Sequence, residues 1–530
     1  MATEVKQNNK SGFRVSTDGL FLLMQLCVAL GGGLILAWAL AAWGIGINSD
    51  SEAYHVMSRC LSEKEGAFNA VPDCKTLSLH FPPLYPLLIS LMRGWTESFM
   101  ERSAGLNVFL YSGSIFVSGS LFKRLTGLPF MGPAGALLVA VAPVVVKAHT
   151  EAMTEAVFIF LTLAGLFFFL CYLERTSYWR LLAAGVLTGL SLLCRFAGLT
   201  TILAMMVTIV LFKSQQRKPA IFDSVFFVLI ALMPMGGWWI RNFFDYGLSL
   251  DRIVVFHPPG WSGWSEASGV FCMWLMSPVF CSFIKEIVLL LGFVVFFLFC
   301  WRIGKALALR NTKDTEIFLF WSFMAVMAIL FYLIGLVLTI SWLDGYMTLS
   351  RRYLLPVYVF AMILFPAWLL RRTICCQASG SLRVFLGKVL LVYWVFFNCS
   401  VSVTWLWQQH SRGSGYASRN WRQSPTMQEL CRLSREHVIF TNLKAAAVIH
   451  SGARIFEIPW LSDPMNSRMN AHYQQELEQM VRQIKAGNGL LVYFDQAPSD
   501  LPIESAQVLT ERLSLRMVAK FADGAVYLPE

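Results

Sequence analysis

Charged residues are scarce in this sequence. They make up 14% of the 530 residues, whereas 56% are hydrophobic, and soluble globular domains usually have about 25% charged residues. The shortage of charge excludes an ordinary soluble protein and predicts a membrane protein. Runs of about 20 apolar residues, enough to cross a bilayer, include 20–47, 221–240, 318–340 and 384–407. Because backbone groups in lipid must bond within the chain, these runs are predicted to be helices.

Motifs that indicate other classes of protein are also missing. No Gly-rich phosphate loop follows the first strand expected in the C-terminal region, so we do not predict nucleotide binding. The 12 cysteines lack metal-ligand spacing, which disfavours a thiolate zinc site. The absence of an internal repeat weakly disfavours a transporter made of two related halves. The first apolar run lacks a small-residue cleavage site, so it is predicted to be a retained helix and not a cleaved signal.

The positive charge lies between the apolar runs. The net charge is +11, but residues 406–530 hold 13 Lys and Arg against 12 Asp and Glu, so a net charge of +10 belongs to the membrane part. Basic residues near span ends mark cytoplasmic loops, and this placement argues against nucleic acid as a partner. Eleven spans put the basic clusters on one side. The predicted spans are 20–47, 104–122, 129–147, 156–173, 179–194, 197–212, 221–240, 283–301, 317–341, 354–370 and 384–406.

The fold class predicted from this pattern is mainly α: a polytopic bundle of about eleven transmembrane helices, with a small C-terminal α/β domain outside the membrane. Residues 1–19 form a cytoplasmic tail, residues 20–407 the membrane domain, and residues 48–103 its large first external loop. Residues 408–530 form the soluble external domain. Within the first loop, Phe81–Trp95 is predicted to lie at the interface, because a crossing there would move the basic clusters outside.

The C-terminal region alternates short strands with helical patterns. Tyr473, Leu477, Met480 and Ile484 share one face of an expected helix. This alternation predicts an α/β domain with a mainly parallel sheet. The expected strands are Val438–Thr441, Arg454–Ile458, Leu490–Phe494 and Met517–Phe521.

Two pairs of cysteines share external loops. Cys60 and Cys74 lie in the first loop, and Cys272 and Cys281 lie in a later one. Either pair can be oxidised if this face is periplasmic. Spacing alone does not fix the geometry of a disulfide, so both states remain open at this stage.

Two carboxylates follow the first span, in Asn48-Ser49-Asp50-Ser51-Glu52. A carboxylate at the membrane surface can take the proton of an attacking hydroxyl, or help to hold a metal or a sugar hydroxyl. The alternative is a structural role, since residues 49–51 are good helix N-caps. Both roles can hold together.

A second acidic group lies where the third span ends and the fourth begins. His149, Glu151 and Glu155 are the candidates there. Glu151 and Glu155 are four residues apart, so they share a face if the turn is helical. A solvated interfacial turn with a Lys–Glu contact is an equally good interpretation.

Basic residues at the predicted external ends form a third group. They break the positive-inside rule, and guanidinium groups bind phosphate through paired hydrogen bonds, so a lipid phosphate site accounts for them. For any single arginine, snorkelling to the interface is the better explanation. The candidates are Arg195, Arg241, Arg351 and Arg352, with Tyr353 beside the last pair.

The segment His80–Leu87 is rigid and aromatic and lies beside the first acidic pair. Its prolines fix the backbone and can shape the wall of a groove. His80 and Tyr85 are its candidate substrate-binding residues.

Taken in order, these features resemble the C-type glycosyltransferase superfamily. The similarity is to the bacterial branch that includes protein O-mannosyltransferases and the enzyme that adds aminoarabinose to lipid A. It spans roughly residues 20–370. The matching pieces are Asp50/Glu52, His80–Leu87, Glu151/Glu155, Leu193–Leu199, Trp238–Asn242 and Arg352–Pro356.

The resemblance implies an inverting transfer of a sugar from a polyprenyl-phosphate donor to a hydroxyl of a glycan, lipid or protein acceptor. Asp50 is then the base, Glu52 and Glu151 position sugar, acceptor or a metal, and Arg241 and Arg352 hold the donor phosphate. A divalent metal is possible, and no cofactor is certain. The resemblance further implies a bacterial inner membrane, with the N-terminus cytoplasmic and the C-terminal domain periplasmic.

The sequence departs from the family pattern in two places. Ser51 separates the two acids, which leaves open which of them is the base. A Trp-Trp-Asp motif is missing, so transfer of a whole glycan to asparagine is disfavoured. A lipid or sugar transporter or flippase is the main alternative function, and a non-catalytic scaffold is a third. The nearly charge-free span centres favour a site at the membrane surface over a transport path.

Overall fold

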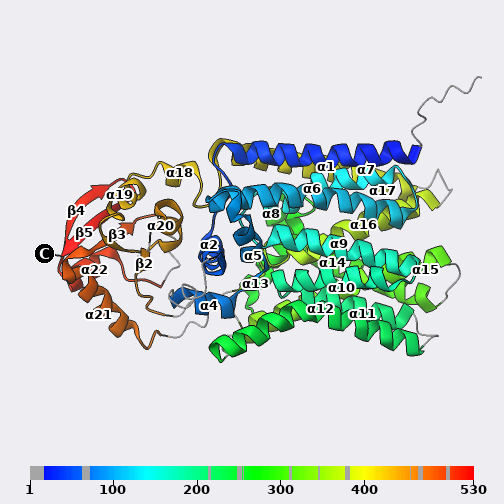
Figure 1. The fold of residues 1–530 in the computed structure, drawn as a ribbon. Helices are drawn as coiled ribbons and strands as arrows, with labels where there is room; N and C mark the ends of the chain where they lie inside the picture. The colour runs from blue at the N-terminus through cyan, green and yellow to red at the C-terminus, as the bar shows by residue number, and fades with distance from the viewer. Residues whose placement is uncertain are drawn as a thin grey trace, which may run out of the picture.

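A computed structural model describes residues 17–62, 72–212, 217–247, 254, 256–308, 313–343, 347–375, 382–453, 455–462, 469–496 and 502–529. Most of the predicted cytoplasmic tail lies outside these residues. The rest comprises a long helical bundle and a small sheet domain at one end of it (Figure 1).

Seven helices within the described residues are long and apolar enough to cross a membrane. The bundle is mainly α, as predicted from the apolar runs. The seven are α1 (Thr17–Ala41), α6 (Phe99–Thr126), α9 (Glu155–Glu174), α12 (Arg217–Tyr246), α14 (Pro278–Ala308), α15 (Lys313–Trp342) and α17 (Leu382–Arg412).

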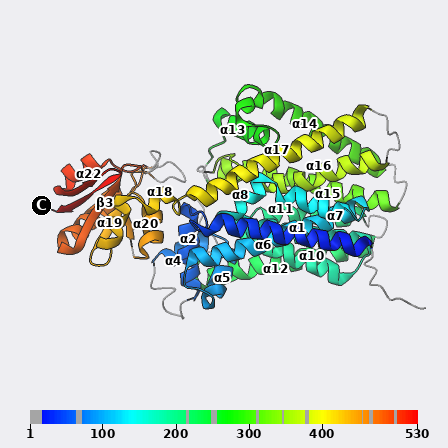
Figure 2. The same ribbon diagram turned by 90° about the horizontal axis from the view of Figure 1, so that it is seen from above.

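The other predicted spans correspond to shorter or broken helices. Residues 129–147 form α7 (Met131–Ala140) and α8 (Pro143–His149), which meet at a bend of 64°. The bend falls at Pro143, since proline cannot donate the helical hydrogen bond. The three shorter helices are α10 (Tyr178–Cys194), α11 (Gly198–Phe212) and α16 (Leu355–Cys375), and they lie along the bundle beside the long ones (Figures 1 and 2).

One end of the bundle carries the basic pair Lys123 and Arg124, each beside an acidic residue. At one end, Lys123 lies 3.8 Å from Asp18, and Arg124 lies 2.5 Å from Glu174. These residues join the start of α1 to the ends of α6 and α9. The sheet domain lies at the opposite end, together with the first loop (Figure 1). The predicted basic loops and the predicted acidic loops are therefore separated by the length of the bundle.

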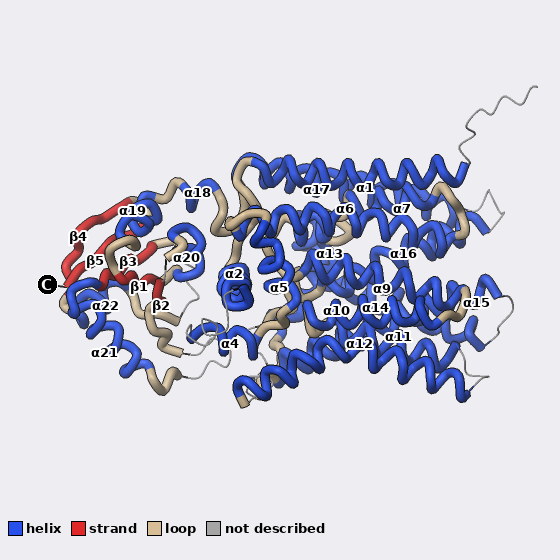
Figure 3. The backbone as a smooth tube through the Cα atoms, in the orientation of Figure 1, coloured by secondary structure: helices blue, strands red, loops and turns tan. Residues whose placement is uncertain are grey.

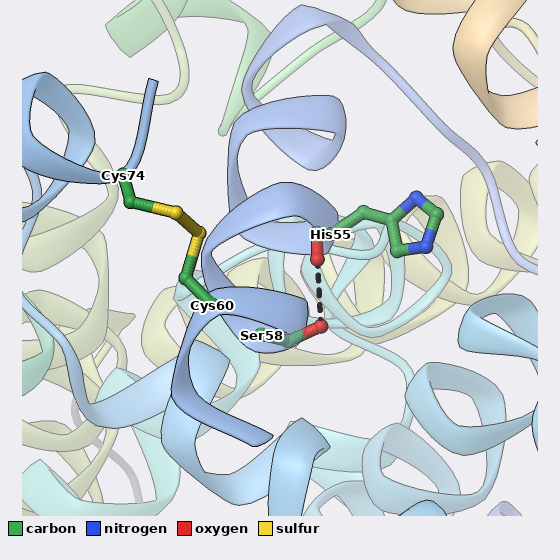
Figure 4. The surroundings of a disulfide bond; sticks show 4 residues. All are labelled: His55, Ser58, Cys60 and Cys74. Carbon is green, nitrogen blue, oxygen red and sulfur yellow. Dashed lines mark hydrogen bonds between the residues drawn. A yellow bond between two sulfur atoms is a disulfide. The ribbon is translucent and has the colours of Figure 1, made fainter. Parts of the chain in front are cut away.

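The first loop forms compact helices across the end of the bundle. They are α2 (Ser49–Ser62), α4 (Pro72–His80) and α5 (Leu84–Leu91), with a short 3-10 turn at Met92–Gly94. A disulfide joins Cys60 on α2 to Cys74 on α4 (Figure 4). Cys272 and Cys281 are free thiols. At eight residues, α5 is too short to cross a bilayer.

Three further helices lie on one flank of the bundle and in the linker to the sheet domain. Figure 2 shows α13 (Trp261–Met273) beside α14 on one flank of the bundle, away from α12. After α17 the chain passes through α18 (Arg419–Arg422) and α19 (Pro425–Leu433) into the sheet domain.

The sheet domain contains all the named strands (Figure 3). Its five strands run in the order β2-β1-β3-β5-β4. They are β1 (Val438–Thr441), β2 (Ile455–Glu457), β3 (Gly489–Phe494), β4 (Leu515–Phe521) and β5 (Gly524–Pro529), and the helices are α20 (Lys444–Ser451), α21 (Tyr473–Gln483) and α22 (Ala506–Leu513), with a π-turn at Ile484–Asn488.

The sheet is mixed, and this differs from the mainly parallel sheet predicted. Strand β1 pairs in parallel with β2 and β3, whereas β5 pairs antiparallel with β3 and β4. Strand β5 was missing from the sequence prediction. It returns after a turn of only two residues, Ala522 and Asp523, and so short a connection forces an antiparallel hairpin.

Candidate active site

Helix α2 begins at Ser49, after a short turn that follows α1. The residue that caps α2 shows whether Asp50 has the structural role. The side chain of Asn48 accepts a hydrogen bond from the Ser51 backbone N–H at 3.2 Å, while Ser51 Oγ accepts from the Asn48 N–H at 3.1 Å. This reciprocal pair is a capping box. Asn48 is therefore the cap, and the structural role considered for Asp50 is filled by another residue.

Asp50 instead forms an ion pair with Arg352. The Arg352 Nη1 atom lies 2.6 Å from Asp50 Oδ2, and its Nε atom lies 2.7 Å from Glu155 Oε1. One guanidinium thus joins three segments that lie far apart in the sequence. The planar fork of arginine suits this geometry, because its N–H donors point in fixed directions.

Glu155 also binds Arg195. The Arg195 Nη1 atom lies 2.5 Å from Glu155 Oε1 and 3.1 Å from the hydroxyl oxygen of Thr154. The Glu155 side chain is 5% exposed and that of Arg195 is 11% exposed, so this pair is almost dry. Removing one partner of such a pair leaves a buried charge without compensation, which is strongly destabilising.

The two acids and two arginines form a charge-balanced set, here named the Arg352 cluster: Asp50, Glu155, Arg195 and Arg352. The ends of helices bring them together. Asp50 lies in the first turn of α2, Glu155 begins α9, Arg195 follows α10, and Arg352 precedes α16. All four helix ends lie at the sheet-domain end of the bundle (Figure 1).

Electrostatics keep Arg352 and its neighbour Tyr54 in defined protonation states. Burial alone lowers the pKa of Arg352, but Glu155 and Asp50 outweigh it and raise that pKa well above its ordinary value. Burial first, and then the Asp50 carboxylate, raise the pKa of the Tyr54 phenol. Tyr54 therefore stays a neutral hydroxyl beside the cluster.

Glu52 lies on a different face of α2 from Asp50. Two residues correspond to a rotation of about 200° around a helix. The Glu52 carboxylate lies 4.0 Å from Lys444 Nζ, at the start of α20 in the sheet domain. The acidic pair seen in the sequence is thus divided, with Asp50 bound to the membrane domain and Glu52 next to the other domain.

Glu151 lies in the short loop between α8 and α9, beside the chain that leads into α2. Its backbone segment pairs with the chain just before α2, through bonds of 2.8 Å from Gly46 N–H to Thr150 O and from Ala152 N–H to Gly46 O. Its side chain lies 3.8 Å from Lys147. Burial raises the pKa of the Glu151 carboxyl, and Lys147 opposes that shift only in part.

Three predicted residues lie deeper or beside the cluster. His149 is fully buried, and its Nδ1 lies 2.7 Å from the Val145 carbonyl oxygen. Tyr85 is also fully buried, and its ring packs edge-on against Tyr54 at 5.4 Å. His80 ends α4 and its ring contacts that of Phe81. Tyr85 therefore supports the cluster through Tyr54, while His149 belongs to the packed interior.

The remaining predicted residues have contacts outside the cluster. Arg241 lies 2.9 Å from Asp245, both near the end of α12. Arg351 is exposed and contacts the sulfur of Met273. Tyr353 accepts a hydrogen bond at its carbonyl oxygen from the Tyr332 hydroxyl. Of the four predicted arginines, the structure joins Arg195 and Arg352 to the acids through Glu155.

No group of three or more His, Cys, Asp or Glu side chains that could hold a metal ion is found within the described part of the chain. A cavity of about 590 Å³ opens in the linker between α17 and α19, lined in part by Arg412, Ser418 and Arg419. Its lining does not include the Arg352 cluster.

Sequence reasoning missed three residues that the structure places at the site: Tyr54, Thr154 and Lys444. Tyr54 follows Asp50 by four residues, so helical spacing could have placed the two on one face. Thr154 directly precedes Glu155. No signal in the sequence connects Lys444 to Glu52, because they belong to different domains.

The fold of this chain is similar to that of known membrane enzymes. Residues 82–238 match the protein-family model of dolichyl-phosphate-mannose-protein mannosyltransferases. ArnT from Cupriavidus metallidurans, in a crystal structure bound to undecaprenyl phosphate, superimposes with a TM-score of 0.57 at 11% identity, over 97% of this chain and 98% of that one. No curated protein matches the chain.

A second solved structure has a similar fold. The arabinofuranosyltransferase AftD from mycobacteria matches with a TM-score of 0.50 at 12% identity, over 95% of this chain and 39% of that one. At such low identity, both likenesses establish the fold. The resemblance inferred from the sequence is confirmed: the chain is a polytopic membrane protein with the C-type glycosyltransferase fold, and its segment 82–238 is similar to the dolichyl-phosphate-mannose-protein mannosyltransferases.

Proposed function

We propose that this protein transfers a sugar from a polyprenyl-phosphate donor to a hydroxyl of an acceptor at the membrane surface, with inversion at the anomeric carbon. The observation that carries the proposal is the bridge from Asp50 through Arg352 to Glu155. It holds a carboxylate at the end of a membrane helix bundle whose fold is shared with a protein solved with undecaprenyl phosphate bound.

Asp50 is the base in this mechanism. Its Oδ2 atom is held by Arg352, and we assign Oδ1 to receive the proton of the acceptor hydroxyl. The acceptor oxygen then forms a bond to the anomeric carbon as the bond from that carbon to the phosphate oxygen breaks. Attack from the face opposite the phosphate inverts the configuration, and the polyprenyl phosphate leaves with the electron pair.

Arg352 is assigned to the donor phosphate as well as to Asp50. Arginine has five N–H donors in a fixed fork, and 32% of the Arg352 side chain is exposed. A phosphate can therefore approach it while the ion pairs persist. Positive charge beside the departing phosphate stabilises the transition state. Arg241 and Arg351 are candidates for a second contact to the donor.

The proposed side of the membrane is external. The Cys60–Cys74 disulfide lies in the same loop region as Asp50, and disulfides persist in oxidising compartments. The basic residues at the other end of the bundle fit a cytoplasmic face. A bacterial inner membrane with the sheet domain in the periplasm satisfies both observations.

The test compares Asp50→Asn with wild type in cells that lack the gene. Surface glycolipids, polysaccharides and glycoproteins are compared by mass spectrometry after complementation. General-base contributions are typically 10²–10⁴-fold, so we expect Asp50→Asn to lose at least about 99% of the wild-type product. Glu174→Gln, at the opposite end of the bundle, is the matched control and should retain it.

Equal membrane insertion and an unchanged unfolding temperature establish that the Asp50→Asn protein is folded. Wild-type levels of product from that folded variant would contradict the proposal. A transporter is distinguished by assaying purified protein with a polyprenyl-phosphate sugar extract, since a transporter makes no new glycosidic bond.

A further inference from the structure

The sheet domain contacts the helix that carries both acids. Helix α20 packs against α2, and Lys444 Nζ lies 4.0 Å from Glu52. The Glu52 side chain is 14% exposed and that of Lys444 is 25% exposed. Both charges are therefore largely removed from water, where an ion pair is worth more than on an open surface.

The start of α20 is fixed within its own domain. Asn442, at the end of β1, donates a hydrogen bond to the Phe494 carbonyl at 2.8 Å and accepts one from the Phe494 N–H at 2.9 Å. These bonds tie the end of β1 to the end of β3. Lys444 thus projects from a rigid turn at the carboxyl edge of the parallel strands. In α/β sheets, that edge is where ligands are usually bound.

The other end of α20 is attached to the segment that leads into α2. His450 Nε2 lies 2.7 Å from the Tyr416 carbonyl oxygen, and the Tyr416 N–H donates to the Ile47 carbonyl at 2.7 Å. Gly415 makes this approach possible: its φ is +56°, and an added Cβ would lie 1.9 Å from the Ile47 oxygen. Helix α20 is therefore linked to α2 near its start, through Lys444, and to the chain just before α2 near its end, through Tyr416.

We propose that the sheet domain completes the active site, with Lys444 as a positioning residue that anchors α2 through Glu52 and so keeps Asp50 oriented toward the acceptor. The inference rests on the proposed function and extends it to a domain that the sequence left without a role. In this arrangement Asp50 is positioned by the membrane domain through Arg352, and Glu52 by the sheet domain through Lys444.

The experiment measures steady-state kinetics of the full-length protein with four variants: Lys444→Met, Lys444→Arg, Glu52→Gln and the double variant Lys444→Met/Glu52→Gln. We expect Lys444→Met to lower kcat at least tenfold while the KM for the donor changes less than twofold. Lys444→Arg should recover most of the loss, because it restores the charge. The double variant should be no worse than Glu52→Gln alone, because Lys444 acts through Glu52.

Lys520→Met is the matched control. Lys520 lies in the same domain and pairs with Asp495 of its own sheet at 2.7 Å, so its loss should leave kcat unchanged. The inference is overturned if Lys444→Met has wild-type kcat, if Lys444→Arg is as poor as Lys444→Met, or if the two losses multiply in the double variant.

A second measurement separates this inference from the proposed function. Hydrogen exchange of the α2 amides needs no substrate. We expect those amides to exchange faster in Lys444→Met than in wild type or Lys520→Met. Unchanged α2 exchange overturns the positioning role even if transfer is confirmed. Faster exchange in a protein with no transferase activity supports the contact between the domains while refuting the proposed function.

Discussion

The two acids of α2 have different partners, and the contrast shows how the site is divided. Asp50 lies 2.6 Å from Arg352 inside a network of four charges. Glu52 lies 4.0 Å from Lys444 across a domain boundary. The first contact belongs to the packed end of the helical bundle, and the second depends on how the sheet domain sits against α2.

This difference has a physical consequence for each carboxylate. In the Arg352 cluster, Glu155 is 5% exposed and holds two arginines, so the position of Asp50 is tied to buried packing. The contact of Glu52 with Lys444, at 4.0 Å, is longer than that of Asp50 with Arg352, at 2.6 Å, and restrains the carboxylate less. Asp50 is thus the better candidate for the fixed base, and Glu52 for a group that adjusts as substrate binds.

The largest effect is expected from Glu155→Ala, which tests the buried ion pairs of the Arg352 cluster. The change removes the carboxylate shared by Arg195 and Arg352 and leaves both cations poorly compensated. Breaking a buried ion pair in this way costs about 3–5 kcal/mol. The free energy of unfolding in detergent should fall by that amount.

Glu174→Ala provides the comparison, since Glu174 and its partner Arg124 are 28% and 40% exposed. Exposed pairs contribute about 1 kcal/mol or less, so this control should be nearly as stable as wild type. Equal losses in the two variants would show that the Arg352 cluster is no more important to the fold than an ordinary surface pair.

The membrane fold could be predicted from the sequence because lipid allows few solutions. Each predicted apolar span corresponds to a helix or to a broken pair of helices. The boundaries were less accurate: α6 begins at Phe99, before the predicted residue 104. Ser98 caps it by accepting from the Glu101 N–H at 3.3 Å. The Ser-x-x-Glu spacing that indicates such a start was present in the sequence.

The four residues of the Arg352 cluster could be predicted from the sequence, but the ion pairs between them could not. The carboxylates and arginines at helix ends were identified because charge is costly near lipid. Their pairing depends on which helices become neighbours, and Asp50, Glu155 and Arg352 are separated by about a hundred residues or more at each step. The contact between Glu52 and Lys444 depends further on how two domains pack. Neither arrangement is encoded in a local motif.

Removal of the disulfide between Cys60 and Cys74 tests whether packing alone holds α2 in place. The two cysteines are 14 residues apart, and closing a loop of this length stabilises a protein by about 3 kcal/mol in the chain-entropy model. The double variant Cys60→Ser/Cys74→Ser should therefore unfold at a lower temperature. Reductant should lower the unfolding temperature of wild type and leave the double variant unchanged. A double variant as stable as wild type would mean that packing alone fixes α2.

The smallest effect expected is a pH dependence from His55, also on α2. Burial, and then Arg59 and Arg102, lower the pKa of His55 to about 4, compared with about 6.5 for an unfolded chain. The unfolded state therefore takes up a proton more readily than the folded state. This contribution to stability is fully present above about pH 6.5 and is lost as the pH falls toward 4.

His55→Gln removes the titrating group while keeping a polar side chain of similar length. The difference in unfolding temperature between wild type and His55→Gln, measured from pH 7.5 down to 4, should shift against wild type as the pH falls. A constant difference across that range would show that His55 is hydrated in the folded protein. The face of α2 that carries His55 would then be open to water, and the different roles of Asp50 and Glu52 would have to be explained by their partners alone, Arg352 and Lys444.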